Sequence, residues 1–199
     1  TNIASVDATT AASITAAGVG GAKLTPISAF EHMTSPRNVD VNDVAHNGTR
    51  WVATTNYGGN PAGNILVSDD AVVWKGYVTD AAVSYERVIW WPEKNLWLAA
   101  AYDRVSRAAS AGTSWTNATI ALETPKGMAS SPSVAVVVGQ RSSQGRYGYS
   151  SNGSSWGSAK FHADNAGSSA NDVAWNGSIF CAVGTKGGAA VWTSSNGSS

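Results

Sequence analysis

The chain has 199 residues, of which 43% are apolar, so it is long enough to bury a sizeable core. Thirteen basic residues balance thirteen acidic ones, and charged residues make up only 13% of the sequence. We therefore expect no basic surface that would collect nucleic acid, and no apolar run reaches the ~18 residues that a membrane-spanning helix needs.

The first 37 residues are rich in Ala, Thr, Ser and Gly. Only weak helical patterning is visible there, in the stretch ASVDATTAASITAAG. We expect residues 1–37 to be a linker or an attachment segment, or to lend a strand to the domain that follows.

From residue 38 onward the sequence repeats itself. The phrase NDVAHNG at Asn42–Gly48 returns as NDVAWNG at Asn171–Gly177, and Trp74, Trp115 and Trp156 follow one another at intervals of 41 residues. A fixed period of this length indicates a repeat architecture. We place the four copies at residues 38–82, 83–124, 125–168 and 169–199.

Each copy contains short runs rich in Val, Ile, Thr and Trp that are separated by turn residues, which is the pattern of β-strands joined by hairpins. Asn-Gly dipeptides begin at Asn47, Asn152, Asn176 and Asn196 and predict two-residue type I′ turns. A large apolar residue recurs on the expected second strand, and we predict that it packs between neighbouring sheets. The residues at this position are Trp51, Trp97, Ala135 in the third copy, and Phe180.

Four-stranded units of 40 to 45 residues predict an all-β fold, a β-propeller of antiparallel blades, because one such unit cannot bury both faces of its sheet alone. The fourth copy breaks off before its last strand. We therefore expect either the N-terminal segment or another chain to pair beside residues 189–195, since an unpaired strand edge promotes aggregation.

A serine-rich turn precedes the expected last strand of every copy: SDDAVVW, SAGTSW, SSNGSSW and SSNGSS. Side chains of Ser, Asp or Asn in such turns can accept hydrogen bonds from backbone amides two residues further on. The turn residues are Ser68, Asp70 and Trp74; Ser110 and Trp115; Ser150, Asn152, Gly153 and Trp156; and Ser194, Asn196 and Gly197.

These turns resemble the Asp-box, or BNR, repeat of sialidase-like propellers, although they are one residue shorter and Asn often replaces Asp. The resemblance implies a propeller blade, and it implies a structural role for the turns. Phrases of the type S-x-[DN]-G-x-x-W in a chain rich in Ser, Thr, Gly and Ala are also similar to those of bacteriophage tail-fibre and receptor-binding proteins.

The second resemblance implies a non-enzymatic structural or binding protein of a virion, or one outside the cell. Its partners would be a host-surface glycan or receptor, other virion or surface proteins, and another chain that completes the ring, including a second copy in a homo-oligomer. Two alternatives stay open: a secreted sialidase-like hydrolase fragment, and a propeller scaffold for a larger assembly.

Loops on one end of a repeat scaffold are where binding usually resides. We expect the connections between the second and third strands of each copy to be long and variable, at residues 55–64, 102–105, 140–146 and 185–188. Together with the links between copies they predict a ligand-binding rim. Its candidate residues are Tyr57, Tyr102, Asp103, Arg104, Arg141, Arg146, His162 and Lys186.

Catalytic patterns are scarce. The sequence has no G-x-S-x-G elbow, and His162 with Asp164 lacks the further ligands that a zinc or calcium site requires. Sialidase chemistry would require an arginine cluster, of which Arg37 is a faint trace. We therefore expect no catalytic residue, no metal and no cofactor.

Overall fold

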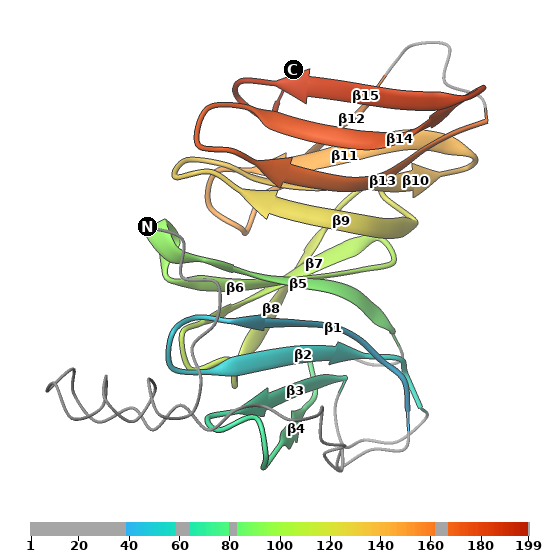
Figure 1. The fold of residues 1–199 in the computed structure, drawn as a ribbon. Helices are drawn as coiled ribbons and strands as arrows, with labels where there is room; N and C mark the ends of the chain where they lie inside the picture. Colours follow the sequence, from blue (N-terminus) through green and yellow to red (C-terminus); the bar gives the residue numbers. More distant parts are fainter. Residues whose placement is uncertain (1–38, 59–63, 80–82, 162–166, 199) are drawn as a thin grey trace, which may run out of the picture. The chain divides into compact units, whose positions relative to one another are not determined.

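The computed structural model describes residues 39–58, 64–79, 83–161 and 167–198 (Figure 1). All of them belong to one compact unit, Thr34–Ser199. The expectations for the N-terminal segment lie outside the described residues. Within the described part of the chain, no helix is long and apolar enough to cross a membrane.

In the described residues, fifteen strands form four antiparallel sheets, which we call blades 1 to 4. Blade 1 contains β1 (Val41–His46), β2 (Trp51–Thr55), β3 (Ile65–Ser68) and β4 (Lys75–Tyr77). Blade 2 contains β5 (Tyr85–Trp91), β6 (Leu96–Ala101), β7 (Arg104–Ala109) and β8 (Trp115–Thr119), with a short 3-10 helix, η1 (Pro92–Lys94), between β5 and β6. Blade 3 contains β9 (Thr124–Ser130), β10 (Ala135–Arg141), β11 (Gln144–Ser150) and β12 (Gly157–Lys160). Blade 4 contains β13 (Ser168–Trp175), β14 (Phe180–Lys186) and β15 (Ala189–Ser194).

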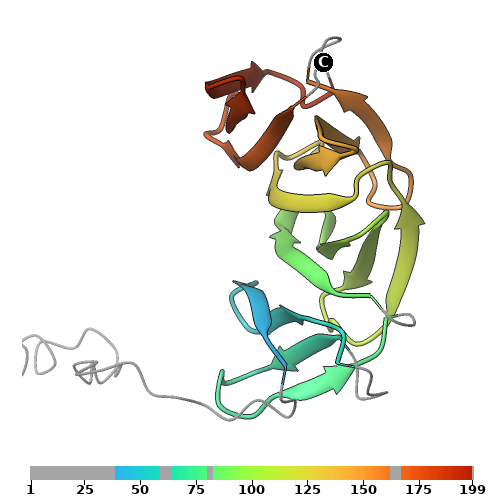
Figure 2. The same cartoon turned by 90° about the vertical axis from the view of Figure 1, so that its right-hand side faces the viewer.

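Every blade is a simple meander in which each strand pairs with the next one along the chain. The first strands of successive blades are neighbours, because β1 packs against β5, β5 against β9, and β9 against β13 (Figures 1 and 2). The all-β prediction and the incomplete fourth unit are therefore confirmed: blade 4 has three strands among the described residues.

The second strand of each blade supplies the side chains that hold neighbouring blades together. Trp97 of β6 is fully buried and packs against Val52 and Val67 of blade 1. Phe180 of β14 packs in the same way against Val136 of blade 3. Alternate residues of one strand thus serve two interfaces, which confirms the predicted packing role of this position.

Trp51 occupies the same position in blade 1 but is only half-buried. Its ring lies 4.3 Å from that of His46, measured between centroids, on the same blade. The same sequence signal therefore gives a deeply buried residue in one copy and a partly exposed one in another.

The serine-rich turns satisfy their backbone amides internally, as predicted. In blade 3 the Ser150 hydroxyl accepts from the Gly153 amide at 2.8 Å, and Asn152 Oδ1 accepts from the amides of Ser154 and Ser155 at 2.9 and 3.0 Å. These bonds close the turn without any partner from another blade.

Blade 4 repeats this arrangement, since Ser194 Oγ accepts from the Gly197 amide at 2.8 Å and Asn196 Oδ1 accepts from the Ser198 amide at 2.9 Å. Blade 2 has no Asp or Asn in its turn, and a backbone bond of 2.8 Å from the Gly112 amide to the Ala109 carbonyl closes it.

The type I′ prediction for the Asn-Gly dipeptides is wrong. The glycines do adopt positive φ, for example 98° at Gly48 and Gly177, whereas the preceding asparagines do not. Asn47 and Asn176 instead use their side-chain oxygens to accept from backbone amides two and three residues further on. The loops are four residues long because this side-chain bonding replaces the tight hairpin.

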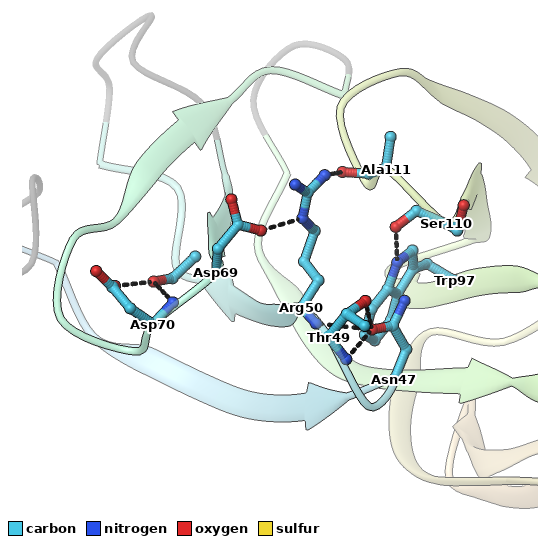
Figure 3. A network of polar contacts seen from close by, with 9 residues as sticks. Asn47, Thr49, Arg50, Asp69, Asp70, Trp97, Ser110 and Ala111 are labelled. Atoms are coloured by element: carbon cyan, nitrogen blue, oxygen red, sulfur yellow. Dashed lines mark hydrogen bonds and ion pairs between the residues drawn. The ribbon is translucent and has the colours of Figure 1, made fainter.

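Arg50, in the turn between β1 and β2, links two blades at the end where the serine-rich turns lie (Figure 3). Its Nε lies 2.6 Å from Asp69 Oδ1, and its Nη1 donates to the Ala111 carbonyl of blade 2 at 2.6 Å. Nearby, Trp97 Nε1 donates to the Ser110 carbonyl at 3.1 Å. This end of blades 1 and 2 is therefore fixed by polar contacts as well as by packing.

Replacing Trp97 with alanine should reduce the free energy of unfolding by about 3–5 kcal/mol, because a fully buried ring is lost from an interface that cannot collapse around the cavity. The matched change Trp51→Ala should cost clearly less. Denaturant unfolding of the two variants measures both losses. Equal losses would show that Trp51 is as tightly packed as Trp97.

Asp70 makes the turn of blade 1 sensitive to pH. The amides of Val73 and Val72 and the Ser68 hydroxyl donate to its carboxylate and hold the pKa below its ordinary value of 3.8. Since the folded state favours the charged form, this stabilisation is present above the unfolded pKa and is lost as pH falls through the folded pKa.

We expect the wild-type chain to have a higher melting temperature than Asp70→Asn at neutral pH, and the difference to shrink as pH falls below about 4. Asparagine is the matched substitution, because Asn152 and Asn196 serve the same turn in blades 3 and 4. Thermal melts across this pH range test the effect, and a difference that stays constant with pH would contradict it.

Candidate functional site

The strand register brings the predicted rim together at one end of the blades. The end of each second strand pairs with the start of the first strand, as in Val41 with Thr55 and Tyr85 with Ala101. The turns between second and third strands therefore lie beside the links that join successive blades.

Hydrogen bonds connect these two sets of loops. The Tyr57 amide donates to Ser84 Oγ at 2.9 Å, and the Asp103 amide donates to the Leu122 carbonyl at 2.8 Å. The rim is thus a bonded structure rather than a set of separate loops.

The predicted long loops are absent from blades 2, 3 and 4, where the connections are two-residue turns at residues 102–103, 142–143 and 187–188. Strands β7 and β11 take up the residues that were expected to be loop. Ser142 and Ser143 both adopt positive φ, 49° and 59°, as a tight hairpin with the twist of the strands requires. Only the connection in blade 1, residues 56–64, is long.

Two of the predicted rim residues are large and exposed. The exposed fraction is 45% for Tyr57 and 56% for Tyr102. Lys186, at the end of β14, is exposed as well. His162 lies outside the described residues.

The charged rim candidates are largely engaged with their neighbours. Arg104 Nε lies 3.1 Å from Asp103 Oδ1, and Arg141 Nε lies 3.5 Å from Glu123 Oε1. Arg146 is a ladder residue of β11 whose Nε is buried without a hydrogen-bond partner. Arg104 and Arg146 are therefore largely held within the rim, whereas the side chain of Arg141 is exposed.

A second set of polar residues, which the sequence analysis did not predict, lies on the innermost strands β1, β5, β9 and β13. Each of these strands has a register irregularity near its start, at the rim end of the blade. Such a bulge breaks the regular alternation and re-aims side chains. The residue pairs at these points are Asn42-Asp43, Glu86-Arg87, Lys126-Gly127 and Asn171-Asp172.

Asn42 and Asp43 reach from blade 1 to the first strand of blade 2. Asn42 Nδ2 donates to the Tyr85 carbonyl at 2.8 Å, and Asp43 Oδ2 accepts from the Val88 amide at 2.9 Å. The other oxygen of Asp43 accepts from the amide of Val44 at 2.9 Å. We call this set of inter-blade bonds the inner clasp.

The inner clasp continues through blades 2 and 3. Arg87 Nε donates to the Lys126 carbonyl at 2.5 Å. Lys126 Nζ in turn donates to Ser169 Oγ at 2.9 Å and to Asn171 Oδ1 at 3.2 Å. Blades 1, 2 and 3 therefore each give side-chain contacts to the first strand of the next blade.

The inner clasp borders a hollow of about 320 Å³. Two carboxylates, a guanidinium, an ammonium and an amide line it, so it offers both donors and acceptors to a polar ligand. Its lining residues are Asp43, Arg87, Ile89, Lys126, Gly127, Met128, Asn171 and Asp172. A Cβ on Gly127 would lie 2.6 Å from Asp172 Cα, so only glycine allows this approach of β9 to β13.

The sequence carried a signal for this hollow. The repeated NDVA phrase places Asn42-Asp43 and Asn171-Asp172 at the same position of two strands. The polar pair was interpreted only as evidence of a repeat. The sequence alone does not show that the pair faces the neighbouring blade.

No protein-family model matches the sequence, and no curated protein matches it. Solved structures do match. The chain is similar to the Dos1 propeller, with a TM-score of 0.55 and 14% identity, over 78% of this chain and 47% of that one. It is also similar to a chain of a nidogen/laminin complex, with a TM-score of 0.56 and 14% identity, over 77% and 64% of the two chains.

The chain has the β-propeller fold. A third similar structure, the GH74 enzyme of Niastella koreensis, has a TM-score of 0.54 at 14% identity, over 73% of this chain and 26% of the enzyme. The chain thus spans about half of the Dos1 propeller, under two thirds of the nidogen/laminin chain and about a quarter of the enzyme. At this identity the likeness shows the fold alone.

Removing the Asp43 carboxylate should destabilise the propeller by about 1–3 kcal/mol, because the Val88 amide loses a charged acceptor. Asp172→Ala is the matched control. Within the described residues, the Asp172 carboxylate accepts only from the amide of Val173, in its own blade. Denaturant unfolding should show the larger loss for Asp43→Ala, and a loss at least as large for Asp172→Ala would contradict the inner clasp.

Proposed function

We propose that this propeller is a non-enzymatic recognition module that binds a surface glycan at its rim end. The observation that carries the proposal is the hollow of about 320 Å³ on the innermost strands, which combines charged and amide groups of both hydrogen-bonding types. It lies at the end of the blades that also presents Tyr57 and Tyr102.

The chemistry of these groups suits a sugar. Hydroxyl groups of a glycan both donate and accept, so a pocket with carboxylates, an amide and cationic groups can pair with them. Exposed tyrosine rings add an apolar face with a polar tip. A small number of placed polar groups beside aromatic surface is the usual composition of a specific ligand site.

The hydrogen bonding of Asp43 supports a non-enzymatic role. Glycoside hydrolysis requires two carboxyl groups, one of them free to give and take a proton. Both oxygens of Asp43 accept hydrogen bonds from backbone amides, those of Val44 and Val88. This carboxylate already holds two blades together, so we do not assign it the role of a proton donor and acceptor.

The setting that we propose is a virion, such as a phage tail or fibre, or the outside of a cell, where the module would attach to a host glycan or receptor. The Ser- and Gly-rich repeats, similar in style to tail-fibre phrases, support this setting. A role as an assembly scaffold is the second candidate. It is favoured by β15, which pairs only with β14 in the described part of the chain.

A glycan-array screen with the purified chain tests the proposal, followed by affinity measurements on the best ligand. Tyr102→Ala and Asn171→Ala should each weaken binding by about tenfold or more. Lys94→Ala, in the connection between β5 and β6 at the other end of blade 2, should leave it unchanged.

Two results would count against the proposal. Unchanged affinity in both rim-end variants would place the ligand elsewhere. Turnover of a fluorogenic sialoside by the wild-type chain would contradict the non-enzymatic role.

A further inference from the structure

The tryptophan that closes each of the first three copies is held in the same way. Its indole Nε1 donates to the carbonyl three residues earlier in the turn. The distance is 3.0 Å from Trp74 to Ala71, 2.8 Å from Trp115 to Gly112, and 3.2 Å from Trp156 to Gly153. The fourth strand of the blade begins at the tryptophan in blade 2 and directly after it in blades 1 and 3.

The rings of Trp115 and Trp156 each pack between their own blade and the one before. Trp156 packs on the apolar cluster of blades 2 and 3, which includes Leu98, Ala100 and Ile120 on one side. Met128, Ala135 and Val137 belong to the other side of the same cluster. These six side chains belong to the cluster against which the ring of Trp156 packs.

An apolar hollow of about 130 Å³ occupies the corresponding place between blades 3 and 4. On its blade 3 side the strand register gives a one-to-one correspondence with the surroundings of Trp156. Val136, Val138 and Phe161 stand where Leu98, Ala100 and Ile120 stand one blade earlier.

The blade 4 side corresponds in the same way. Val173, Phe180 and Ala182 stand where Met128, Ala135 and Val137 stand one blade earlier. The hollow therefore corresponds to the place that the closing tryptophan occupies in blade 3. The described part of blade 4 ends at Ser198, which corresponds to Ser154 of blade 3.

Blade 4 also contains the carbonyl that would accept a hydrogen bond from the indole. Gly197 lines the hollow and occupies the position of Gly153, so its carbonyl corresponds to the one that accepts from Trp156. The turn around Gly197 makes the same side-chain bonds as the turn of blade 3, with Ser194 and Asn196 as acceptors.

Strand β15 lies at the edge of its sheet in the described residues, beside the hollow. The third strands β3, β7 and β11 each pair with a strand on both sides, whereas β15 has a paired neighbour only in β14 within residues 167–198. An unpaired edge can take up an extended peptide, with main-chain bonds giving affinity and side-chain pockets giving specificity.

We propose that this hollow binds the indole ring of a tryptophan at the start of an extended peptide segment, and that the segment adds to β15 as the fourth strand of blade 4. The volume fits an aromatic ring, since an apolar cavity of about 150 Å³ takes up benzene. Residues 115–119 and 156–160 show the chemistry of such a segment: a tryptophan followed by small and polar residues.

The test uses the full chain and a fluorescein-labelled peptide WTNATI, which copies residues 115–120. Fluorescence anisotropy should report binding, and the peptide with its tryptophan replaced by alanine should bind at least about tenfold more weakly. Absence of binding, or equal binding of the two peptides, overturns the proposal.

Two protein variants locate the bound peptide. Ala182→Leu should fill the hollow and abolish binding, because Ala182 is buried and lines it. Ala174→Leu is the matched control on the same blade and should bind as the wild type does, because Ala174 is exposed on β13. Loss of binding in both variants, or in neither, contradicts this location.

Free indole provides a second measurement if Ala182→Leu fails to fold. Indole should compete with the peptide on the wild-type chain and raise its melting temperature, as a ligand of the folded state does. Failure of indole to compete would contradict the pocket. Tyr102→Ala should leave peptide binding intact, so this result is independent of the proposed glycan site at the rim end.

Discussion

Burial of both faces of a four-stranded sheet is the constraint on which this molecule depends. A sheet of about 35 residues cannot exclude water from two apolar faces by itself, and stacking on the next blade solves the problem for both. The second strand of each blade carries the decisive side chains, because successive residues point to opposite interfaces. In β6, Trp97 packs towards blade 1 whereas Leu98 packs towards blade 3.

The two ends of the blades differ in how much their turns vary from copy to copy. At one end the serine-rich turns of blades 3 and 4 have nearly the same sequence, and their Ser and Asn side chains accept hydrogen bonds from backbone amides of the same turn. At the other end the turns differ in sequence, bear exposed tyrosines, and surround the bulged starts of the innermost strands. A repeat scaffold of this kind keeps its geometry constant at one end while the other end varies.

Much of this architecture could be predicted from the sequence, because the repeat period, the turn residues and the recurring apolar position are all local patterns. Trp97 and Phe180 lie between blades as predicted. The errors arose where a local pattern had two solutions: Asn47 bonds the backbone with its side chain instead of entering a type I′ turn. Residues 144–146 form the start of strand β11 instead of a loop.

Other features could not be predicted from the sequence of a single copy. The bulge at Asp43 shows only in the pairing of β1 with β2, and the role of its carboxylate shows only in the position of Val88 on the next blade. Trp51 and Trp97 have the same sequence setting, so their difference in burial depends on the neighbour that each one meets.

The inner clasp also gives the stack of blades a direction. The side chains of Asn42 and Asp43 on blade 1 bond to the backbone of Tyr85 and Val88 on blade 2, so the two sides of the contact differ. Such a contact is heterologous, with unlike surfaces meeting, and cannot be made by two blades placed face to face about a twofold axis. Blades of this protein can therefore follow one another only head to tail, and the order of the copies along the chain is also their order in space.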